Sequence, residues 1–236
     1  MKLKSNLLSF LFPRKCVMCD RAVAESGDLG GFCPKCAERL KLIRGPVCLT
    51  CGRPVERHRE YCSDCGEIRH EFTAGRFAFR YSDISDSVYR FKYDKHPEYA
   101  KTYAEVLYRE LKPWIESLNA DAFIPVPIHK KRFLKRGFNQ SELLAKELSK
   151  LSGIPCYEKL VERHRNTLPQ KNFDRNTRKI NVKNSFICTE NSVKLSNAIL
   201  IDDIYTTGST LDSVTGVLKA RGIRNVYFIT ITAAGT

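Results

Sequence analysis

The spacing of apolar residues changes character after about residue 72. Beyond that point, apolar positions recur either in short runs or at three- and four-residue intervals, which predicts alternating strands and helices. Strands are expected at 77–81, 121–127, 185–188, 198–201 and 225–231, and helices at 85–93, 99–115 and 139–151. Such alternation predicts an α/β fold with a mostly parallel, doubly wound sheet. We therefore expect two domains, a small one at 1–72 and an α/β domain at 73–236.

The first 72 residues carry paired cysteines instead of a regular apolar period. Eight of the ten cysteines form four pairs with two residues between the sulfurs: Cys16/Cys19, Cys33/Cys36, Cys48/Cys51 and Cys62/Cys65. This spacing allows both thiolates of a pair to reach one tetrahedral Zn²⁺. We assign the first four cysteines to one zinc and the last four to a second. An interleaved pairing is the alternative that the spacing leaves open.

Closed shells of four cysteines leave no open coordination position, so both zinc ions are expected to be structural. A segment of this size has little core of its own, and metal binding would supply its folding free energy. A disulfide scaffold is the other interpretation of these thiols. Nothing in the sequence indicates secretion, and paired thiols in a reducing compartment more often hold metal. We expect a cytoplasmic protein.

The formal net charge is +14, which eight thiolates on two Zn²⁺ would lower to about +10. The surplus is concentrated between residues 128 and 182, where 14 lysines and arginines face 5 acidic residues. A polyanionic partner is expected. No apolar run reaches the roughly 18–20 residues of a membrane span, so we expect no integral membrane insertion. Residues 2–12 predict a short amphipathic helix, packed on the protein or attached to a membrane surface.

Residues 198–210 combine a strand with acidic and hydroxyl side chains. The run Ala-Ile-Leu-Ile is followed by Asp202 and Asp203, and then by a small loop that leads into a helical pattern. Carboxylates at the carboxyl end of a parallel strand can accept hydrogen bonds from ribose hydroxyls. The loop supplies hydroxyls and backbone N–H groups near a helix N-terminus, which suits a phosphate. An ordinary strand end and helix cap would explain only one or two of these residues.

This segment resembles the signature of type I phosphoribosyltransferases, which bind 5-phosphoribosyl-1-diphosphate (PRPP) with Mg²⁺. The resemblance implies that Asp202 and Asp203 hold the ribose. It implies that the 5′-phosphate is bound by Thr206, Thr207, Gly208, Ser209 and Thr210. It also implies that the basic loop after the strand at 121–127 holds the diphosphate, through Lys130, Lys131 and Arg132. A solvated basic loop or a nucleic-acid contact is the alternative for these three residues.

The stretch from Arg163 to Val182 is polar, basic and without period, and it is long for a connection in a compact domain. By the same resemblance it is the loop that closes over PRPP and excludes water from the reacting ribose. Within it, Gln170 and Arg175 are the residues expected to act on the substrate, and Arg175 joins Asp202 and Asp203 as a candidate catalytic residue.

Four features together resemble the ComF family of phosphoribosyltransferase-like proteins, which includes ComFC and GntX. These features are the cysteine ribbons, the Val-Pro-Ile-His-Lys-Lys-Arg segment, the Thr-Leu-Pro-Gln loop and the Asp-Asp-Ile-Tyr-Thr-Thr-Gly-Ser-Thr string. The family implies a type I phosphoribosyltransferase-like sheet with an N-terminal zinc-ribbon domain. It implies a role in natural competence, with single-stranded DNA and a competence helicase or other uptake proteins as partners.

Two functional interpretations follow. In one, the protein binds PRPP and handles single-stranded DNA; in the other, it is an active phosphoribosyltransferase of nucleotide or other metabolism without a DNA role. A purely structural zinc adaptor would leave the sugar-phosphate string unexplained. Glutamine-dependent amidophosphoribosyltransferase activity is not expected, because Lys2 follows Met1 where a cysteine nucleophile is required. A hood over the acceptor would have to come from residues 77–92 or the ribbons, so the acceptor stays open.

Overall fold

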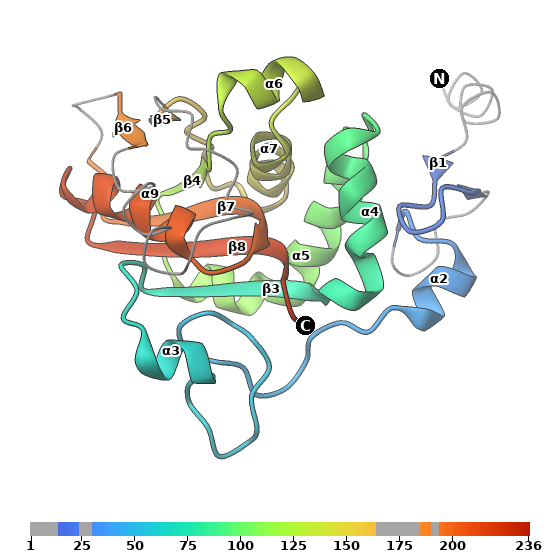
Figure 1. Ribbon diagram of the computed structural model, residues 1–236, viewed down its shortest axis with the longest axis horizontal. Coiled ribbons are helices and arrows are strands. Elements are labelled where there is room, and N and C mark those ends of the chain that lie inside the picture. The colour runs from blue at the N-terminus through green and yellow to red at the C-terminus, as the bar shows by residue number, and fades with distance from the viewer. Residues whose placement is uncertain (1–13, 24–29, 164–184, 190–193) are drawn as a thin grey trace.

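A four-stranded parallel sheet forms the centre of the molecule. The computed structural model describes residues 14–23, 30–163, 185–189 and 194–236. The strands stand in the order β3 (Ala74–Arg80), β8 (Asn225–Ala233), β7 (Asn197–Tyr205) and β4 (Ala122–Pro125), as Figure 1 shows. All three pairings are parallel, in agreement with the predicted fold class. The carboxyl ends of these strands therefore meet at one edge of the sheet.

The two central strands are buried on both faces, because their side chains alternate between two apolar cores. In β7, Ile199 and Ile201 face one core, while Ala198 and Leu200 face the other. All four side chains are fully buried. A continuous apolar run of this kind is the pattern of a parallel strand that is covered on both sides. Each face of the sheet consequently needs its own covering layer.

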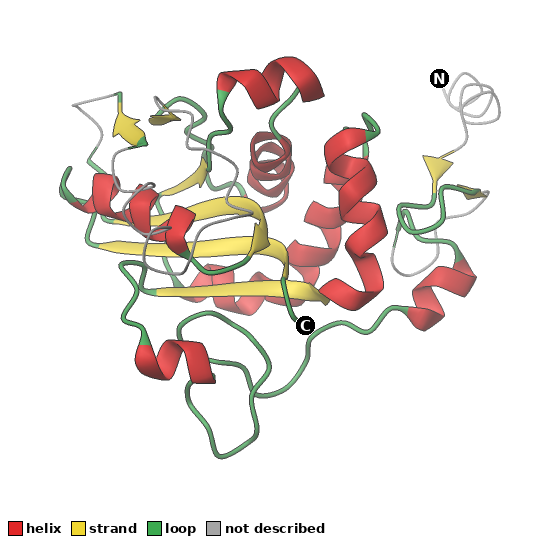
Figure 2. Cartoon of the chain, in the orientation of Figure 1, coloured by secondary structure: helices red, strands yellow, loops and turns green. Residues whose placement is uncertain are grey.

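In the described part of the chain, three helices cover one face of the sheet and one helix covers the other. The first face is packed by α4 (Tyr81–Tyr93), α5 (Tyr99–Ser117) and α7 (Gln140–Ser152). On the second face lie α9 (Ser209–Lys219) and a small antiparallel pair, β5 (Val161–Arg163) with β6 (Phe186–Cys188). Figure 2 shows these layers around the sheet. Among the described residues, no helix has the length and apolar character needed to cross a membrane.

The two cysteine ribbons contribute to different cores of the molecule. The first ribbon contains β1 (Arg14–Lys15), β2 (Ala22–Val23) and α2 (Pro34–Arg39), and it buries Val17 and Phe32 in the core of the three helices. The second ribbon contains α3 (Ser63–Glu67) and buries Cys48 and Cys51 in the core of α9. In Figure 1 the first ribbon lies beside α4 and the second lies below β3. The domain boundary after residue 72 stays a prediction.

Two strand predictions need correction. Residues 186–188 do not join the parallel sheet; they pair antiparallel with 161–163, because Phe186 and Cys188 are buried toward α9 while Ile187 stays exposed. The strand predicted at 198–201 continues to Tyr205, since the residues after Ile201 keep their parallel pairing with β8. The two aspartates therefore lie in the last part of the strand.

The basic segment predicted to be a loop is a helix, α6 (Lys130–Arg136). Its start is capped by His129, whose Nδ1 accepts a hydrogen bond from the N–H of Lys131 at 3.1 Å. Its end is Gly137, which adopts a left-handed φ of +86° that suits a helix C-terminus. The prediction missed these local caps. The side chains of Lys130, Lys131 and Arg132 are exposed on this helix.

The packing of β3 on β8 can be tested at Gly75. A Cβ at this position would lie 2.0–2.3 Å from three ring atoms of Phe228, which is fully buried. We expect Gly75→Ala to lower the free energy of unfolding by about 1–3 kcal/mol. Gly216 in α9 has open space around it, and Gly216→Ala should raise the same quantity by about 0.5–1 kcal/mol. Urea unfolding measures both, and equal stability of Gly75→Ala and the unsubstituted protein would contradict this packing.

Candidate functional site

Two adjacent carboxylates occupy the last part of β7. Asp202 Oδ1 accepts hydrogen bonds from Ser141 Oγ at 3.0 Å and from the N–H of Asp203 at 2.9 Å. Asp203 Oδ1 lies 2.8 Å from Lys92 Nζ, in an ion pair whose side chains are 14% and 17% exposed. Ser141 belongs to the first turn of α7 and Lys92 to the last turn of α4. Three elements therefore meet at this carboxylate pair.

Burial and the neighbouring charge of Asp203 raise the pKa of Asp202 to about 7, from an ordinary value of 3.8. The hydrogen bonds from the Asp203 amide and Ser141, and the charge of Lys92, only partly offset these effects. Two neighbouring carboxylates oppose each other's ionisation. The pair is therefore suited to bind a cation or the hydrogen-bond donors of a ligand. Perturbed carboxyls in such a setting are a mark of functional sites.

The loop that follows β7 turns sharply at Gly208. This glycine has a φ of +77° and forms the N-cap of α9. Thr207 Oγ1 and Ser209 Oγ are 2.6 Å apart, and the side chain of Thr207 is exposed. A small hollow of about 20 Å³ is lined by Asp202 together with Thr206, Gly208 and Thr210. Of the predicted ribose- and phosphate-binding residues, Asp202, Thr206, Gly208 and Thr210 therefore line one hollow, whereas Asp203, Thr207 and Ser209 do not line it.

A buried polar network fixes the end of α4 that carries Lys92. Arg136 donates to Gln140 Oε1 at 3.0 Å and to the hydroxyl of Tyr93 at 3.2 Å. Gln140 Nε2 in turn donates to the carbonyl of Lys92 at 3.3 Å. The segment from Arg136 to Gln140 therefore connects α6 and α7 to α4. Sequence reasoning missed Lys92 and Ser141, because neither carries a recognisable motif and both approach the site only through the fold.

Two further cations lie on the β5 side of the site. The charge of Arg132 and burial both lower the pKa of Arg163, with burial the larger cause, while the charge of Asp202 acts in the opposite direction. The guanidinium of Arg163 stacks over Phe186, 5.2 Å from the ring centroid. Arg163 is therefore a half-buried cation within electrostatic reach of Asp202 and of Arg132 in α6. Sequence analysis placed it at the start of the long basic loop.

Several predicted residues fall outside the described part of the chain. Gln170 and the candidate catalytic Arg175 belong to residues 164–184, and the amphipathic helix predicted at 2–12 belongs to residues 1–13. Their roles stay predictions. The closing loop over PRPP stays a prediction for the same reason.

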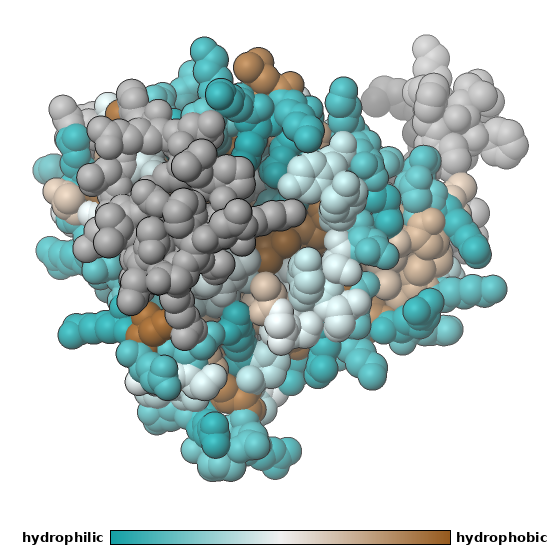
Figure 3. All heavy atoms as spheres, viewed as in Figure 1, coloured by the Kyte–Doolittle hydropathy of each residue, from teal (hydrophilic) through white to brown (hydrophobic). Residues whose placement is uncertain are grey.

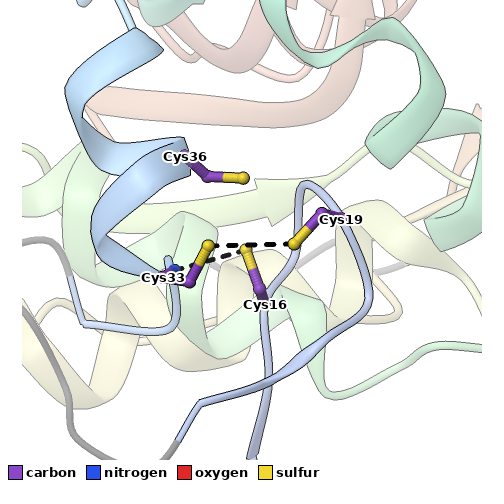
Figure 4. A group of neighbouring side chains, drawn as sticks. All are labelled: Cys16, Cys19, Cys33 and Cys36. Atoms are coloured by element: carbon purple, nitrogen blue, oxygen red, sulfur yellow. Dashed lines mark hydrogen bonds between the residues drawn. The ribbon is translucent and has the colours of Figure 1, made fainter.

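The cysteines gather in two groups of four, in the sequential order predicted. One group holds Cys16, Cys19, Cys33 and Cys36, and the other holds Cys48, Cys51, Cys62 and Cys65. All four sulfurs within each group lie within 4.8 Å of one another. Figure 4 shows the sulfurs of the first group directed toward a common centre, two from the turn after β1 and two from the N-cap and first turn of α2. No interleaved pairing is needed.

The spacing of these sulfurs fits tetrahedral Zn²⁺. Zn–S bonds of about 2.3 Å place the sulfurs of a tetrahedron about 3.8 Å apart. Cys19 and Cys33 are separated by 3.8 Å, and Cys51 and Cys62 by 3.6 Å. Burial raises the pKa of the Cys51 thiol to about 12, and a bound zinc would reverse this effect by stabilising the thiolate. Both groups are closed Cys₄ sites, so the zinc they hold is structural.

The fold and these sites define a zinc-ribbon α/β protein with an acidic pair and a hydroxyl-rich loop at the carboxyl edge of a parallel sheet. Residues 7–66 match the family described as double zinc ribbon domain.

Three relatives extend the similarity to most of the chain. Competence protein F of Haemophilus influenzae is 29% identical over 202 residues, covering 83% of this chain and 87% of its own. Competence protein ComFC of Bacillus subtilis is 29% identical over 80% of this chain and 78% of its own. DNA utilization protein YhgH of Escherichia coli K12 is 27% identical over 81% of this chain and 92% of its own. The chain is thus similar over most of its length to competence protein F, ComFC and YhgH, and its N-terminal part matches a double zinc ribbon.

The raised pKa of Asp202 predicts a pH-dependent stability. The folded state binds the Asp202 proton more tightly than the unfolded chain, so this group's favourable contribution is complete below pH about 4 and is lost as pH rises through about 7. Asp202→Asn keeps an oxygen acceptor without the charge. We expect it to raise the free energy of unfolding by about 2 kcal/mol at pH 8. Urea unfolding should show this gain at pH 8 and little difference at pH 4; a loss of stability at pH 8 would contradict the assignment.

Proposed function

We propose that this protein binds PRPP at the carboxyl end of β7 and handles single-stranded DNA during DNA uptake. The observation that carries the first part is that one small hollow is lined by Asp202 together with Thr206, Gly208 and Thr210 of the loop, while Asp203 is adjacent in the chain. Ribose hydroxyls and a 5′-phosphate lie on one molecule. The carboxylates match the chemistry of the hydroxyls, and the loop matches that of the phosphate.

Each part of PRPP has a partner on the chain. The ribose hydroxyls would donate to Asp203 and Asp202, with Lys92 holding Asp203 in place. The 5′-phosphate would receive hydrogen bonds from the hydroxyls and N–H groups of the 206–210 loop. The diphosphate would face Arg163 and the exposed cations of α6. Mg²⁺, a hard cation that prefers oxygen ligands, would bridge the diphosphate and neutralise part of its charge.

The DNA part is supported by the relatives' names and by an exposed surface beside the PRPP site. We call it the α4–α6 surface and define it by Tyr89, Tyr93, Lys130, Lys131 and Lys135. The two tyrosine rings are 4.8 Å apart and are 59% and 44% exposed. Phosphates of a single strand bind to cations, and its bases stack on exposed aromatic rings.

The position of this surface joins it to the carboxylate pair. Arg136 of α6 lies over the ring of Tyr93, 4.8 Å from its centroid, so the two helices are in contact. Figure 3 shows that most of the visible surface is hydrophilic, with an apolar area at the top over α6, where Phe133 and Leu134 are exposed. A DNA strand bound along α4 and α6 would pass close to Lys92, the residue before Tyr93. Lys92 forms the ion pair with Asp203. PRPP binding could therefore change how the strand is held.

PRPP binding is tested by calorimetric titration of Mg²⁺ and PRPP into the zinc-loaded full chain. We expect saturable binding, a loss of affinity of at least tenfold in Asp203→Asn, and of at least 100-fold when Asp202→Asn is added, because each carboxylate bond to a hydroxyl is worth about 1.5–3 kcal/mol. Asp86→Asn, at an exposed position of α4, is the matched control and should bind as the unsubstituted protein does.

Absence of binding by a folded protein with two zinc ions would overturn the PRPP part of the proposal. Release of diphosphate in the presence of a nucleophile would show turnover, and so identify an active phosphoribosyltransferase.

DNA binding is tested by fluorescence anisotropy with a labelled oligothymidylate at several salt concentrations. Tyr89→Ala should weaken binding by about 1–3 kcal/mol, the value of one base–aromatic stack. Replacing Lys130 and Lys131 by alanine should make the salt dependence shallower by about 0.7 per lost phosphate contact. Tyr61→Ala, at a tyrosine of similar exposure on the second ribbon, is the control and should leave affinity unchanged. Equal effects at Tyr61 and Tyr89, or no salt dependence, would argue against the α4–α6 surface.

A further inference from the structure

The second zinc ribbon, residues 48–65, reaches the 205–210 loop through Arg53. Arg53 Nη2 donates to the carbonyl of Thr206 at 3.1 Å and to the carbonyl of Ala234 at 3.0 Å. Its guanidinium also lies over the ring of Tyr205, 5.4 Å from the centroid. One side chain of the ribbon therefore holds the start of the loop together with the end of β8.

A second connection runs from His70 to the first turn of α9. His70 Nδ1 lies 2.9 Å from Asp212 Oδ2, and the N–H of Glu71 donates to Asp212 Oδ1 at 2.8 Å. The side chain of His70 is 2% exposed, and its ring stacks on Phe72 with centroids 4.5 Å apart. Both oxygens of the Asp212 carboxylate are thus held by the segment that follows the ribbon.

His70 also packs against the turn itself. A Cβ added at Gly208 would lie 2.8 Å from His70 Cε1, so the ring forms a wall immediately behind the sharp turn of the loop. Gly208 itself has a left-handed φ and lines the hollow. Arg53 therefore holds the start of the loop at Thr206. His70 packs against its turn at Gly208 and contacts Asp212 just after it.

The position of Arg53 depends on both cysteine pairs of its ribbon. The N–H of Cys48 donates to the carbonyl of Arg53 at 2.7 Å, closing the turn of the first pair. Arg53 Nη1 forms an ion pair of 2.8 Å with Asp64, which lies between Cys62 and Cys65 of the second pair. A zinc ion that joins the two pairs therefore fixes the base from which Arg53 extends.

The first ribbon has a different target. The carbonyl of Val17 accepts from Arg90 of α4 at 3.1 Å, and Asp20 accepts from the Tyr99 hydroxyl of α5 at 3.0 Å. Among the described residues, its side-chain hydrogen bonds to the α/β part go to these two helices, on the opposite face of the sheet. The two ribbons have the same set of four cysteines, but they contact different elements of the α/β part.

We infer that Arg53 and His70 are positioning residues through which the second zinc ribbon holds the 205–210 loop in its anion-binding conformation. The zinc of this ribbon then controls the loop without touching a ligand, while the zinc of the first ribbon does not. The ligand of the loop rests on the proposed function; the connection between ribbon and loop does not.

The connection is tested on the zinc-loaded full chain by NMR amide hydrogen exchange. Two amides report on the loop: Asp212 N–H donates to Gly208 O at 2.8 Å, and Ala234 N–H donates to Tyr205 O at 2.8 Å. We expect at least tenfold faster exchange of the Asp212 amide in His70→Ala and of the Ala234 amide in Arg53→Ala. Amides in the middle of β7 and β8 should keep their rates, and zinc content should stay at two per chain in His70→Ala.

A conservative replacement and a matched pair of ribbon variants separate positioning from general destabilisation. His70→Asn places an amide donor where Nδ1 stood, and should restore exchange at Asp212 to within threefold of the unsubstituted protein. Cys65→Ser and Cys19→Ser each disrupt one zinc site. The former should accelerate both reporter amides and the latter should not. Unchanged exchange in His70→Ala and Arg53→Ala, or equal acceleration by the two cysteine variants, would overturn the inference.

Titration with Mg²⁺ and PRPP extends the test to the ligand. His70→Ala should weaken binding at least tenfold and His70→Asn less than threefold. Undiminished PRPP affinity in His70→Ala would overturn the inference for the ligand. If the unsubstituted protein binds no PRPP, the proposed function fails, and the exchange rates still decide whether the ribbon holds the loop.

Discussion

The structure depends on a parallel sheet whose central strands are apolar on both faces and must be covered on both. Ile199 and Ile201 must be covered by a layer on one face of the sheet, and Ala198 and Leu200 by a layer on the other. Among the described residues, three helices supply the first layer, and α9 with the β5–β6 pair lies on the second. Each cysteine ribbon adds buried side chains to one of the two cores, Val17 and Phe32 to the first and Cys48 and Cys51 to the second. Zinc therefore contributes to the cores of the α/β part as well as to the ribbons, because buried Cys48 and Cys51 are core residues.

The same strand that creates this constraint carries the site. β7 runs through the centre of the sheet and ends in two carboxylates that repel each other in a poorly solvated place. The fold compensates with Lys92 from α4 and Ser141 from α7, but only in part, because the pKa of Asp202 stays raised. A site that keeps such electrostatic strain needs a rigid surrounding, which the Arg136–Gln140 network supplies.

The sequence predicts the fold class well, because apolar runs such as 198–201 and the cysteine spacing reflect local physics. It also predicts the two sets of zinc ligands in their sequential order. It fails where tertiary contacts decide: Asp202 stays in β7 because β8 continues beside it, and residues 186–188 leave the sheet because β5 pairs with them. Lys92, Arg53 and His70 could not be predicted, since each reaches the site from a distant segment and none belongs to a motif.

The central claim is that the carboxylate pair of β7 and the 206–210 loop bind the ribose and the phosphate of a single ligand. A crystal structure of the zinc-loaded protein grown with Mg²⁺ and PRPP tests it most directly. We predict ribose hydroxyls within hydrogen-bond distance of Asp203 or Asp202, the 5′-phosphate against the amides of the 206–210 loop, and one zinc in each Cys₄ group. PRPP bound elsewhere on the chain, or an empty hollow that is open to solvent at saturating PRPP, would contradict the claim.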